Sequence, residues 1–372
     1  MQKAFTKQKK LIIVALATTA FSASALAETA NVSVYGRADL SFDLINTGSA
    51  ANGTAGVSKN SVSSNVSRLG FKGSEGLGEG LSAVWQIEQQ INMDNTGGTL
   101  ATRNTFLGLK SDSMGTVLMG RHDTPYKLAT RKLDIFGDSI ADNRALLGAV
   151  SGKSATASFD GRQPDVIAYI SPELSGFTGA IAYVNLNEAA TGAAVPGTAT
   201  GKGSALSLAG MFKQEAFYGS LGYETHTLEH VVGNAAGAKE SAWKLGLGYD
   251  IDALGLGFVY EKSSDNLTAV TAANRFGHNA YYLSANYKMG MNAIKFAYGK
   301  AGQLGATANS GSNQFSLGYD HGLSKRTKLY AIYSRISNQS AASYGFSQTT
   351  ATSINGVGAS PSVVSLGMQH SF

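Results

Sequence analysis

Two neighbouring stretches decide the fold class: Trp243-Lys-Leu-Gly-Leu-Gly-Tyr-Asp250 and Leu254-Gly-Leu-Gly-Phe-Val-Tyr-Glu261. In both, large apolar or aromatic residues alternate with glycine or charged residues, with Val259 as the exception. A period of two places alternate side chains on opposite faces of an extended strand. Because only residues 251–253 separate the two stretches, we expect an antiparallel hairpin with one large apolar face.

The same alternation recurs along the chain and predicts an all-β fold of sixteen strands. Short turns alternate with long loops that are rich in small and polar residues. An even number of antiparallel strands of about ten residues, with short turns at one end and long loops at the other, is typical of an outer-membrane barrel. The expected strands span 31–43, 65–74, 80–91, 101–111, 115–121, 164–171, 177–186, 203–213, 216–227, 240–250, 254–264, 276–288, 291–300, 311–320, 326–337 and 361–372.

The composition excludes several other classes of protein. With 43% hydrophobic residues and a formal net charge of +5 over 372 residues, the chain is not disordered. The absence of cysteine excludes disulfides, thiolate nucleophiles and cysteine-ligated metals. After residue 27 no apolar run reaches the length of a membrane-spanning helix.

The two strand faces have the polarity expected in a membrane. One face is large and aromatic, whereas the other is small or charged. The simplest arrangement turns the apolar face outward to outer-membrane lipid and the polar face inward to water, with closure of the barrel pairing every strand edge. A secreted all-β adhesin is the alternative, and detergent dependence and heat-modifiable gel mobility would distinguish the two.

The first 27 residues have the features of a secretory signal peptide. Four lysines precede the apolar run 11–20, and Ala25 and Ala27 supply small residues before a cleavage site after Ala27. Removing the segment leaves residues 28–372 with a formal charge of +1. A basic balance therefore gives no reason to expect a nucleic-acid partner.

Short motifs are spread in order along the whole mature chain. They are Tyr35-Gly36-Arg37, Ser67-Arg68-Leu69-Gly70-Phe71-Lys72-Gly73, Thr102-Arg103, Leu107-Gly108-Leu109-Lys110, Gly120-Arg121, Ser171-Pro172-Glu173-Leu174-Ser175-Gly176-Phe177 and Phe372. This ordered set resembles the proteobacterial general porins. The resemblance implies passive diffusion of ions and small hydrophilic solutes through a homotrimer of sixteen-stranded barrels, each narrowed by an inward-folded third long loop. It also implies that Phe372 is the signal read by the outer-membrane assembly machinery.

The longest connection, about 122–163, matches the constriction loop of that family. The resemblance implies that its carboxylates oppose a ladder of arginines on the barrel wall, so that a transverse field crosses the narrowest point. Arg121 fits the ladder only if a bulge intervenes, since it shares strand parity with the outward residues Val117 and Met119. The acidic candidates are Asp134, Asp138 and Asp142; the basic candidates are Arg37, Arg68, Arg121 and Arg162.

No motif predicts catalysis, a cofactor or a metal site. The run His226-Thr-Leu-Glu-His230 has metalloprotease spacing, but that motif requires a helix and this run ends an alternating strand. A substrate-specific channel, for example one selective for sugars, is the alternative function. It would need an aromatic slide in the lumen, whereas most large aromatic residues have outward parity and the inward Tyr218 and Tyr330 are too few to form one.

Overall fold

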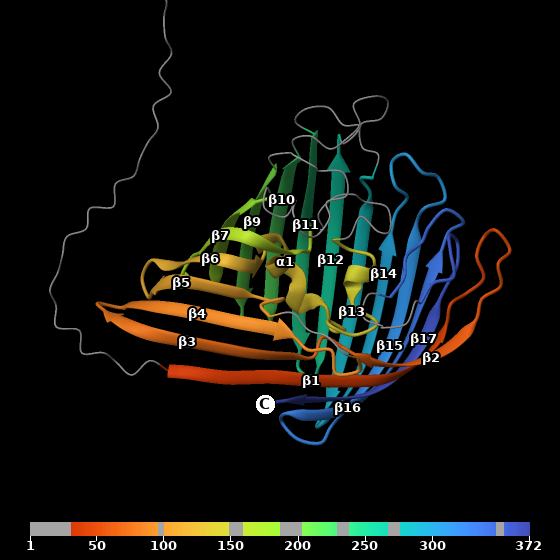
Figure 1. Ribbon diagram of the computed structural model, residues 1–372, viewed down its shortest axis with the longest axis horizontal. Helices are drawn as coiled ribbons and strands as arrows, with labels where there is room; N and C mark the ends of the chain where they lie inside the picture. Colours follow the sequence, from red (N-terminus) through yellow and green to blue (C-terminus); the bar gives the residue numbers. More distant parts are fainter. Residues whose placement is uncertain are drawn as a thin grey trace, which may run out of the picture.

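The protein forms a closed antiparallel β-barrel. The computed structural model describes residues 31–95, 100–148, 159–186, 203–228, 238–266, 276–346 and 353–372, so the expected signal peptide lies outside the described residues. Seventeen strands form one sheet, and β1 pairs with β17 to close it (Figure 1). The first strands are β1 (Asn31–Asn46), β2 (Ser58–Ser64), β3 (Arg68–Gly78), β4 (Leu81–Gln90), β5 (Thr105–Ser111), β6 (Gly115–Asp123), β7 (Arg162–Ile170), β8 (Phe177–Asn185) and β9 (Gly203–Gln214). The remaining strands are β10 (Phe217–Leu228), β11 (Ala238–Ile251), β12 (Leu254–Asp265), β13 (Asn279–Met289), β14 (Asn292–Ala301), β15 (Ser312–Gly322), β16 (Thr327–Asn338) and β17 (Ser362–Ser371).

The predicted count of sixteen barrel strands is confirmed, because β2 and β3 are two halves of one strand. Both pair with β1, β2 along residues 40–46 and β3 along residues 31–37. Between the halves, Val66 has a φ of 56°, which breaks the strand. The prediction that 44–64 is a loop and that the second strand starts at 65 was wrong. The segment Ser58–Ser64 is almost entirely polar, so it carries no alternation to detect.

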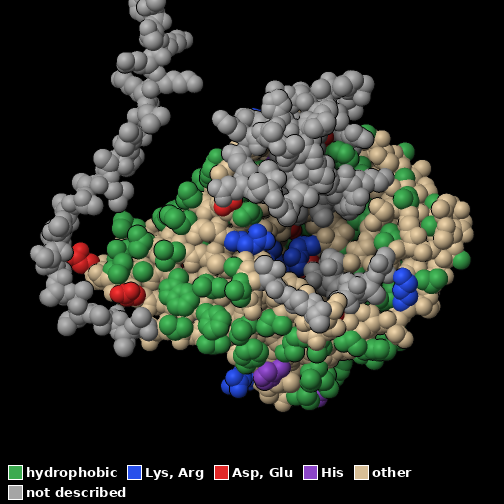
Figure 2. Space-filling model, viewed as in Figure 1, with side chains coloured by type: hydrophobic (Ala, Val, Ile, Leu, Met, Phe, Trp, Pro, Cys, Tyr) green, Lys and Arg blue, Asp and Glu red, His purple; other side chains and the backbone are tan. Residues whose placement is uncertain are grey.

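The side chains of β11 follow the predicted alternation. Trp243, Leu247 and Tyr249 are exposed on the outer face, whereas Ala242 and Lys244 point inward and are buried. Hydrophobic side chains likewise cover much of the outer surface in the space-filling view, and basic side chains gather in the hollow at its centre (Figure 2). The outer face is therefore suited to lipid and the interior to polar contacts.

The C-terminal residue completes the barrel closure. Gly36 and Phe372 exchange two backbone hydrogen bonds, of 3.0 and 3.1 Å. The Phe372 ring lies against Gly36 so closely that a Cβ atom there would be 2.3 Å from the ring. The seam between first and last strands thus depends on glycine at position 36.

The connection between β6 and β7, here called loop L3 (residues 124–161), folds into the barrel. It contains α1 (Pro125–Thr130), which packs against β9, β10 and β11 (Figure 1). A Cβ atom on the inward-facing Gly246 or Gly248 would lie 2.8 or 2.9 Å from the Leu133 side chain. The small inward residues of β11 therefore make the space in which L3 is seated. In the described part of the chain no helix is long and apolar enough to cross a membrane.

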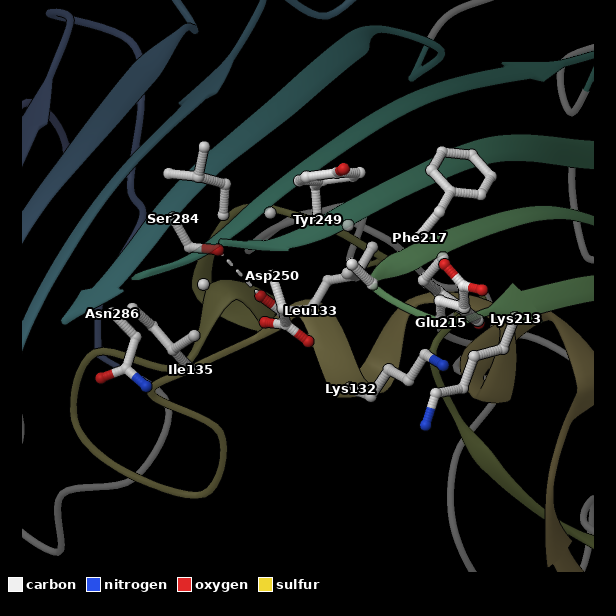
Figure 3. A pocket seen from close by; sticks show the side chains of 16 residues that line it. Lys132, Leu133, Ile135, Lys213, Glu215, Phe217, Tyr249, Asp250, Ser284 and Asn286 are labelled. Carbon is white, nitrogen blue, oxygen red and sulfur yellow. Dashed lines mark hydrogen bonds between the residues drawn. The ribbon is translucent and has the colours of Figure 1, made fainter. Parts of the chain in front are cut away.

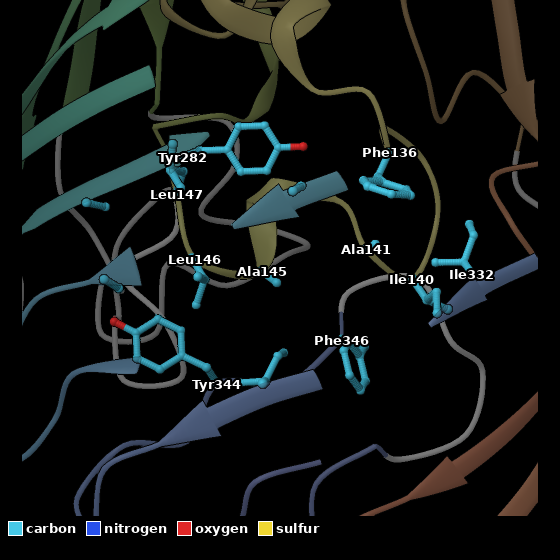
Figure 4. Packing of buried hydrophobic residues seen from close by; sticks show 14 of the residues in the cluster. Phe136, Ile140, Ala141, Ala145, Leu146, Leu147, Tyr282, Ile332, Tyr344 and Phe346 are labelled. Carbon is cyan, nitrogen blue, oxygen red and sulfur yellow. The ribbon is translucent and has the colours of Figure 1, made fainter. Parts of the chain in front are cut away.

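The other side of L3 packs against the loop that follows β16. Phe136, Ile140 and Leu146 of L3 share one buried apolar cluster with Tyr344 and Phe346 (Figure 4). This last loop is in turn held to the first one, because the Ala51 amide donates to the Val357 carbonyl at 2.8 Å. L3 is thus clamped between the barrel wall and an inward-folded outer loop.

We predict that Phe136→Ala loosens L3 without opening the barrel. The ring is buried and fills the space above Gly318, so its loss should cost about 3 kcal/mol of docking free energy. Trypsin should then cleave at Arg131 or Lys132 in folded protein, as judged by heat-modifiable gel mobility. Phe315→Ala is the matched control, because that ring lies on the exposed outer face. Equal protease resistance in both variants would contradict the packing role of Phe136.

Candidate functional site

Asp138 of L3 lies at the centre of an arginine cluster inside the barrel. Its Oδ2 accepts hydrogen bonds from Arg37 Nη2 and Arg68 Nη1, each at 3.1 Å. Its Oδ1 accepts from Arg131 Nη2 at 2.8 Å and from Arg144 Nη2 at 3.4 Å. Two of these guanidinium groups come from the wall and two from L3 itself. The loop and wall charges therefore touch at this point.

The two wall arginines lie directly opposite each other, on β1 and β3. Such a like-charge pair is unfavourable by itself. Two features offset this: Asp138 bridges both, and the Asn65 carbonyl accepts from Arg37 Nη2 at 3.0 Å. Asn65 lies in the break between β2 and β3, and its side-chain amide donates to Ser41 and Tyr330. The strand break thus supplies an acceptor that an unbroken strand would not.

Asp142 organises L3 from within. Its carboxylate accepts two hydrogen bonds from the Arg144 guanidinium, at 2.8 and 2.6 Å, and one from Arg131 at 3.2 Å. It also caps the short 3-10 helix Asn143–Ala145 by accepting from the Arg144 amide, and it accepts from the Asp138 amide at 2.8 Å. Its side chain has no exposed surface.

Asp134 is also enclosed within the loop. Its carboxylate accepts from the Phe136 and Asn143 amides at 3.0 and 3.1 Å and from the Tyr282 hydroxyl at 3.1 Å. The structure therefore places Asp134 and Asp142 inside L3, whereas we expected them on its lumen side. Backbone amides of L3 fold around both carboxylates.

The ionisation of Asp138 is controlled by its neighbours. Burial alone would raise the pKa of its carboxyl group, but the guanidinium groups of Arg131, Arg37, Arg68 and Arg144 outweigh burial and hold the pKa well below its usual range. The carboxylate is therefore ionised at neutral pH. Its contribution to stability is present above the unfolded-state pKa and is lost only as the pH falls through the lower folded-state value.

Arg162 and Arg121 belong to the neighbouring part of the wall. Arg162 pairs with Asp123 at 3.0 Å and donates from Nε to Asn104 at 2.6 Å, and Lys127 binds the same aspartate at 2.8 Å. Arg121 donates from Nε to the Thr102 carbonyl at 3.0 Å. The strand pairing shifts between Gly120 and His122, so the bulge on which the Arg121 assignment depended is present.

Three arginines of the site were not singled out from the sequence. Arg131 and Arg144 of L3 bind Asp138 directly, and Arg103 forms a short contact with Glu88 on the wall next to Arg68. The available signal was the spacing of Arg131 three residues before Asp134, which is an i,i+3 ion-pair pattern. Since loops lack a side-chain period, nothing indicated which way these residues point.

The remaining sequence candidates have structural partners. Tyr218 donates to the Ala129 carbonyl and Tyr330 to Asp39, so both inward tyrosines are buried and engaged. His226 lies on strand β10 and pairs with Glu224 and Glu240, while residues 229 and 230 lie outside the described residues. Within the described ranges, no group of His, Cys, Asp and Glu side chains could hold a metal ion.

Comparisons with known proteins agree with this architecture. The sequence model of the Gram-negative porin family matches residues 13–341. Outer membrane porin protein 32 of Delftia acidovorans is 28% identical, over 98% of this chain and 100% of that protein. An anion-selective porin from Comamonas acidovorans has a TM-score of 0.78 and 24% identity, over 92% of this chain and 100% of that chain. OmpT of Vibrio cholerae, solved in a trimer form, has a TM-score of 0.67 and 14% identity, over 93% of this chain and 100% of that chain.

A closed barrel with an apolar outer face, a polar interior and a loop folded into that interior can pass water-soluble molecules through a membrane. The family match spans most of the chain and fits this geometry. The chain belongs to the Gram-negative porin family and is an integral outer-membrane protein that forms a passive channel across that membrane.

Proposed function

We propose that the channel passes ions and small hydrophilic solutes with a preference for anions, and that Arg37, Arg68 and Asp138 form its constriction. The observation that carries this preference is the cluster of four guanidinium groups around the one carboxylate of Asp138. Passive diffusion through such a channel requires neither a cofactor nor a catalytic step. Arg121 and Arg162 extend the positive wall beside the cluster.

The exposed ends of the cluster are mainly positive. The side chains of Arg68, Arg131 and Arg144 are 23–26% exposed, compared with 15% for Asp138 and 12% for Arg37. Asp134 and Asp142 have no exposed side-chain surface. Their carboxylates bind the arginines from inside L3 and do not face the lumen. An ion in the lumen therefore passes closer to guanidinium groups than to carboxylates.

Charge at this point has a large effect, because water is scarce and screening is weak in a narrow pore. A unit charge about 8 Å from an ion, in a medium of effective dielectric constant about 40, interacts with it by about 1 kcal/mol. The Comamonas acidovorans porin of similar fold is anion-selective, which supports the same preference here.

We predict that Arg68→Gln lowers the chloride-to-potassium permeability ratio by about fivefold, as expected for the loss of one such charge. Asp138→Asn should shift the ratio toward chloride, because it leaves the guanidinium groups unopposed. Reversal potentials across a KCl gradient in planar bilayers measure both effects, and both should weaken at high salt. Arg326→Gln, on an exposed turn, is the control for charge outside the pore. A Cl⁻/K⁺ ratio below one in the wild type would disprove the anion preference.

We infer that the protein assembles as a homotrimer through the face that includes β1. The trimer form of Vibrio cholerae OmpT supports the oligomeric state. On the outer face of β1, the small side chain of Ala38 is only partly covered and would permit close approach of a neighbouring barrel. We predict that Ala38→Trp weakens the trimer but leaves the monomeric barrel folded. An unchanged trimer band on unboiled gels would mean that another face forms the contact.

We infer that Phe372 is the recognition signal for outer-membrane assembly. Val364, Leu366, Met368 and Phe372 are exposed along one outer face of the last strand, as a docking signal requires. We predict that deletion of Phe372 leaves export intact and holds the protein in the periplasm. The measurement is the fraction of heat-modifiable protein in the outer membrane, and wild-type levels would contradict the role of Phe372. We also infer that residues 1–27 are a signal peptide cleaved after Ala27.

A further inference from the structure

A second polar site lies beside the constriction, on the side of L3 that faces the short turns of the barrel. It is a cavity of about 270 Å³ between the L3 residues 132–135 and the inner wall of strands β9 to β13 (Figure 3). Ser284 Oγ donates to the Leu133 carbonyl at 3.1 Å and holds the loop against this wall. The polar lining residues are Lys132, Lys213, Glu215, Asp250, Ser284 and Asn286.

The charged side chains of this cavity have no ion-pair partner, whereas three other lysines of the lumen are paired with aspartates. Lys244 pairs with Asp160, and Lys295 and Lys328 both pair with Asp320. By contrast, Lys132, Lys213, Glu215 and Asp250 form no ion pair within 4.0 Å among the residues that the structure describes. These four groups are therefore available to a solute in the pore.

The two lysines form the positive end of the cavity. Lys132 Nζ lies 3.1 Å from the centroid of the Tyr218 ring, which fixes its position over the wall. The Lys132 and Lys213 side chains extend to the same side of the cavity (Figure 3). Burial, and then the like charge of Lys213, lowers the pKa of Lys132, whereas the Asp250 carboxylate acts in the opposite direction. An anionic group bound between the two would relieve this repulsion.

The cavity also contains groups that would bind a cation or an N–H donor. Asp250 and Glu215 bring two negative charges, which offset the two lysines. Asn286 Oδ1 is buried and accepts no hydrogen bond from any described residue. A buried acceptor without a donor is unfavourable, so rotation of the Asn286 side chain toward a solute with N–H groups would satisfy it. A simple anion would leave these acceptors unused and would be repelled by both carboxylates.

We propose that this cavity is a binding site for small dipolar solutes that carry both a carboxylate and an ammonium group. The carboxylate binds between Lys132 and Lys213, and the ammonium group binds at the Asp250 and Asn286 side. The cavity is large enough for a solute of amino-acid size. This site is separate from the arginine cluster, so it does not depend on the anion preference of the channel.

The test compares three probes with the same four-carbon chain: 4-aminobutyrate, butyrate and butylammonium. Saturation-transfer difference NMR on the detergent-solubilised full-length protein at pH 7 measures weak binding without transport. We expect saturable binding of 4-aminobutyrate and at least tenfold weaker binding of the two singly charged probes, since each lacks one charge-assisted hydrogen bond. This measurement does not involve ion transport, so it would remain valid even if the channel showed no preference for anions.

Variants locate the site. Lys213→Gln and Asp250→Asn should each weaken 4-aminobutyrate binding by about tenfold. Lys328→Gln, which removes a lumen lysine outside the cavity, should leave the dissociation constant unchanged. Heat-modifiable gel mobility and KCl conductance establish that each variant is folded, and Lys132→Gln provides a second test at the positive end.

Three results would overturn the proposal. The first is the absence of saturable 4-aminobutyrate binding. The second is binding of butyrate as tight as that of 4-aminobutyrate with no effect of Asp250→Asn, which would indicate a simple anion site. The third is an equal loss in Lys328→Gln, which would indicate a general effect of lumen charge.

Discussion

The structure depends on one constraint: in lipid, every backbone N–H and C=O group must find its hydrogen-bond partner within the protein. The barrel meets it by pairing β1 with β17 along ten residues, and the Gly36–Phe372 bonds extend that seam to the last residue. Closure leaves an interior that no lipid reaches, so polar and charged side chains there can pair with one another or face water. Hence Lys244, Lys295 and Lys328 point inward and are paired with aspartates.

Loop L3 brings a carboxylate to the charged wall of this interior. Arg37 and Arg68 lie side by side on the wall, and the Asp138 carboxylate offsets their repulsion by forming an ion pair with both. Asp138 has a φ of 65°, which is unfavourable for a residue with a side chain, so the surrounding ion pairs must hold it there. The apolar cluster of Phe136, Ile140 and Leu146 fixes the loop from the opposite side. Packing and charge therefore position the same short segment jointly.

The sequence predicted the barrel wall better than its interior. Strand alternation identified the outward Trp243 and the inward Lys244. With a period of two, the large apolar residues must face the lipid, and their neighbours must then face the lumen. It failed at Ser58–Ser64, where both faces are polar. In L3, the family resemblance gave Asp138 as one of three acidic candidates, but it could not show that Asp134 and Asp142 are enclosed or that Arg131 and Arg144 turn back onto them. Those directions are set by backbone amides and by Tyr282, which is distant in sequence.

The stretch that decides the fold also determines where the loop charges lie. Gly246 and Gly248 occupy inward positions of β11 because the large residues between them face lipid, and the missing side chains leave room for Leu133. Seating Leu133 brings its neighbour Lys132 over the Tyr218 ring, and Asp250 follows on the same inward face of the strand. Larger inward residues at 246 and 248 would lift the loop and separate these charges. The glycines of a lipid-facing strand therefore help to determine the pore chemistry, because they decide where the loop charges lie.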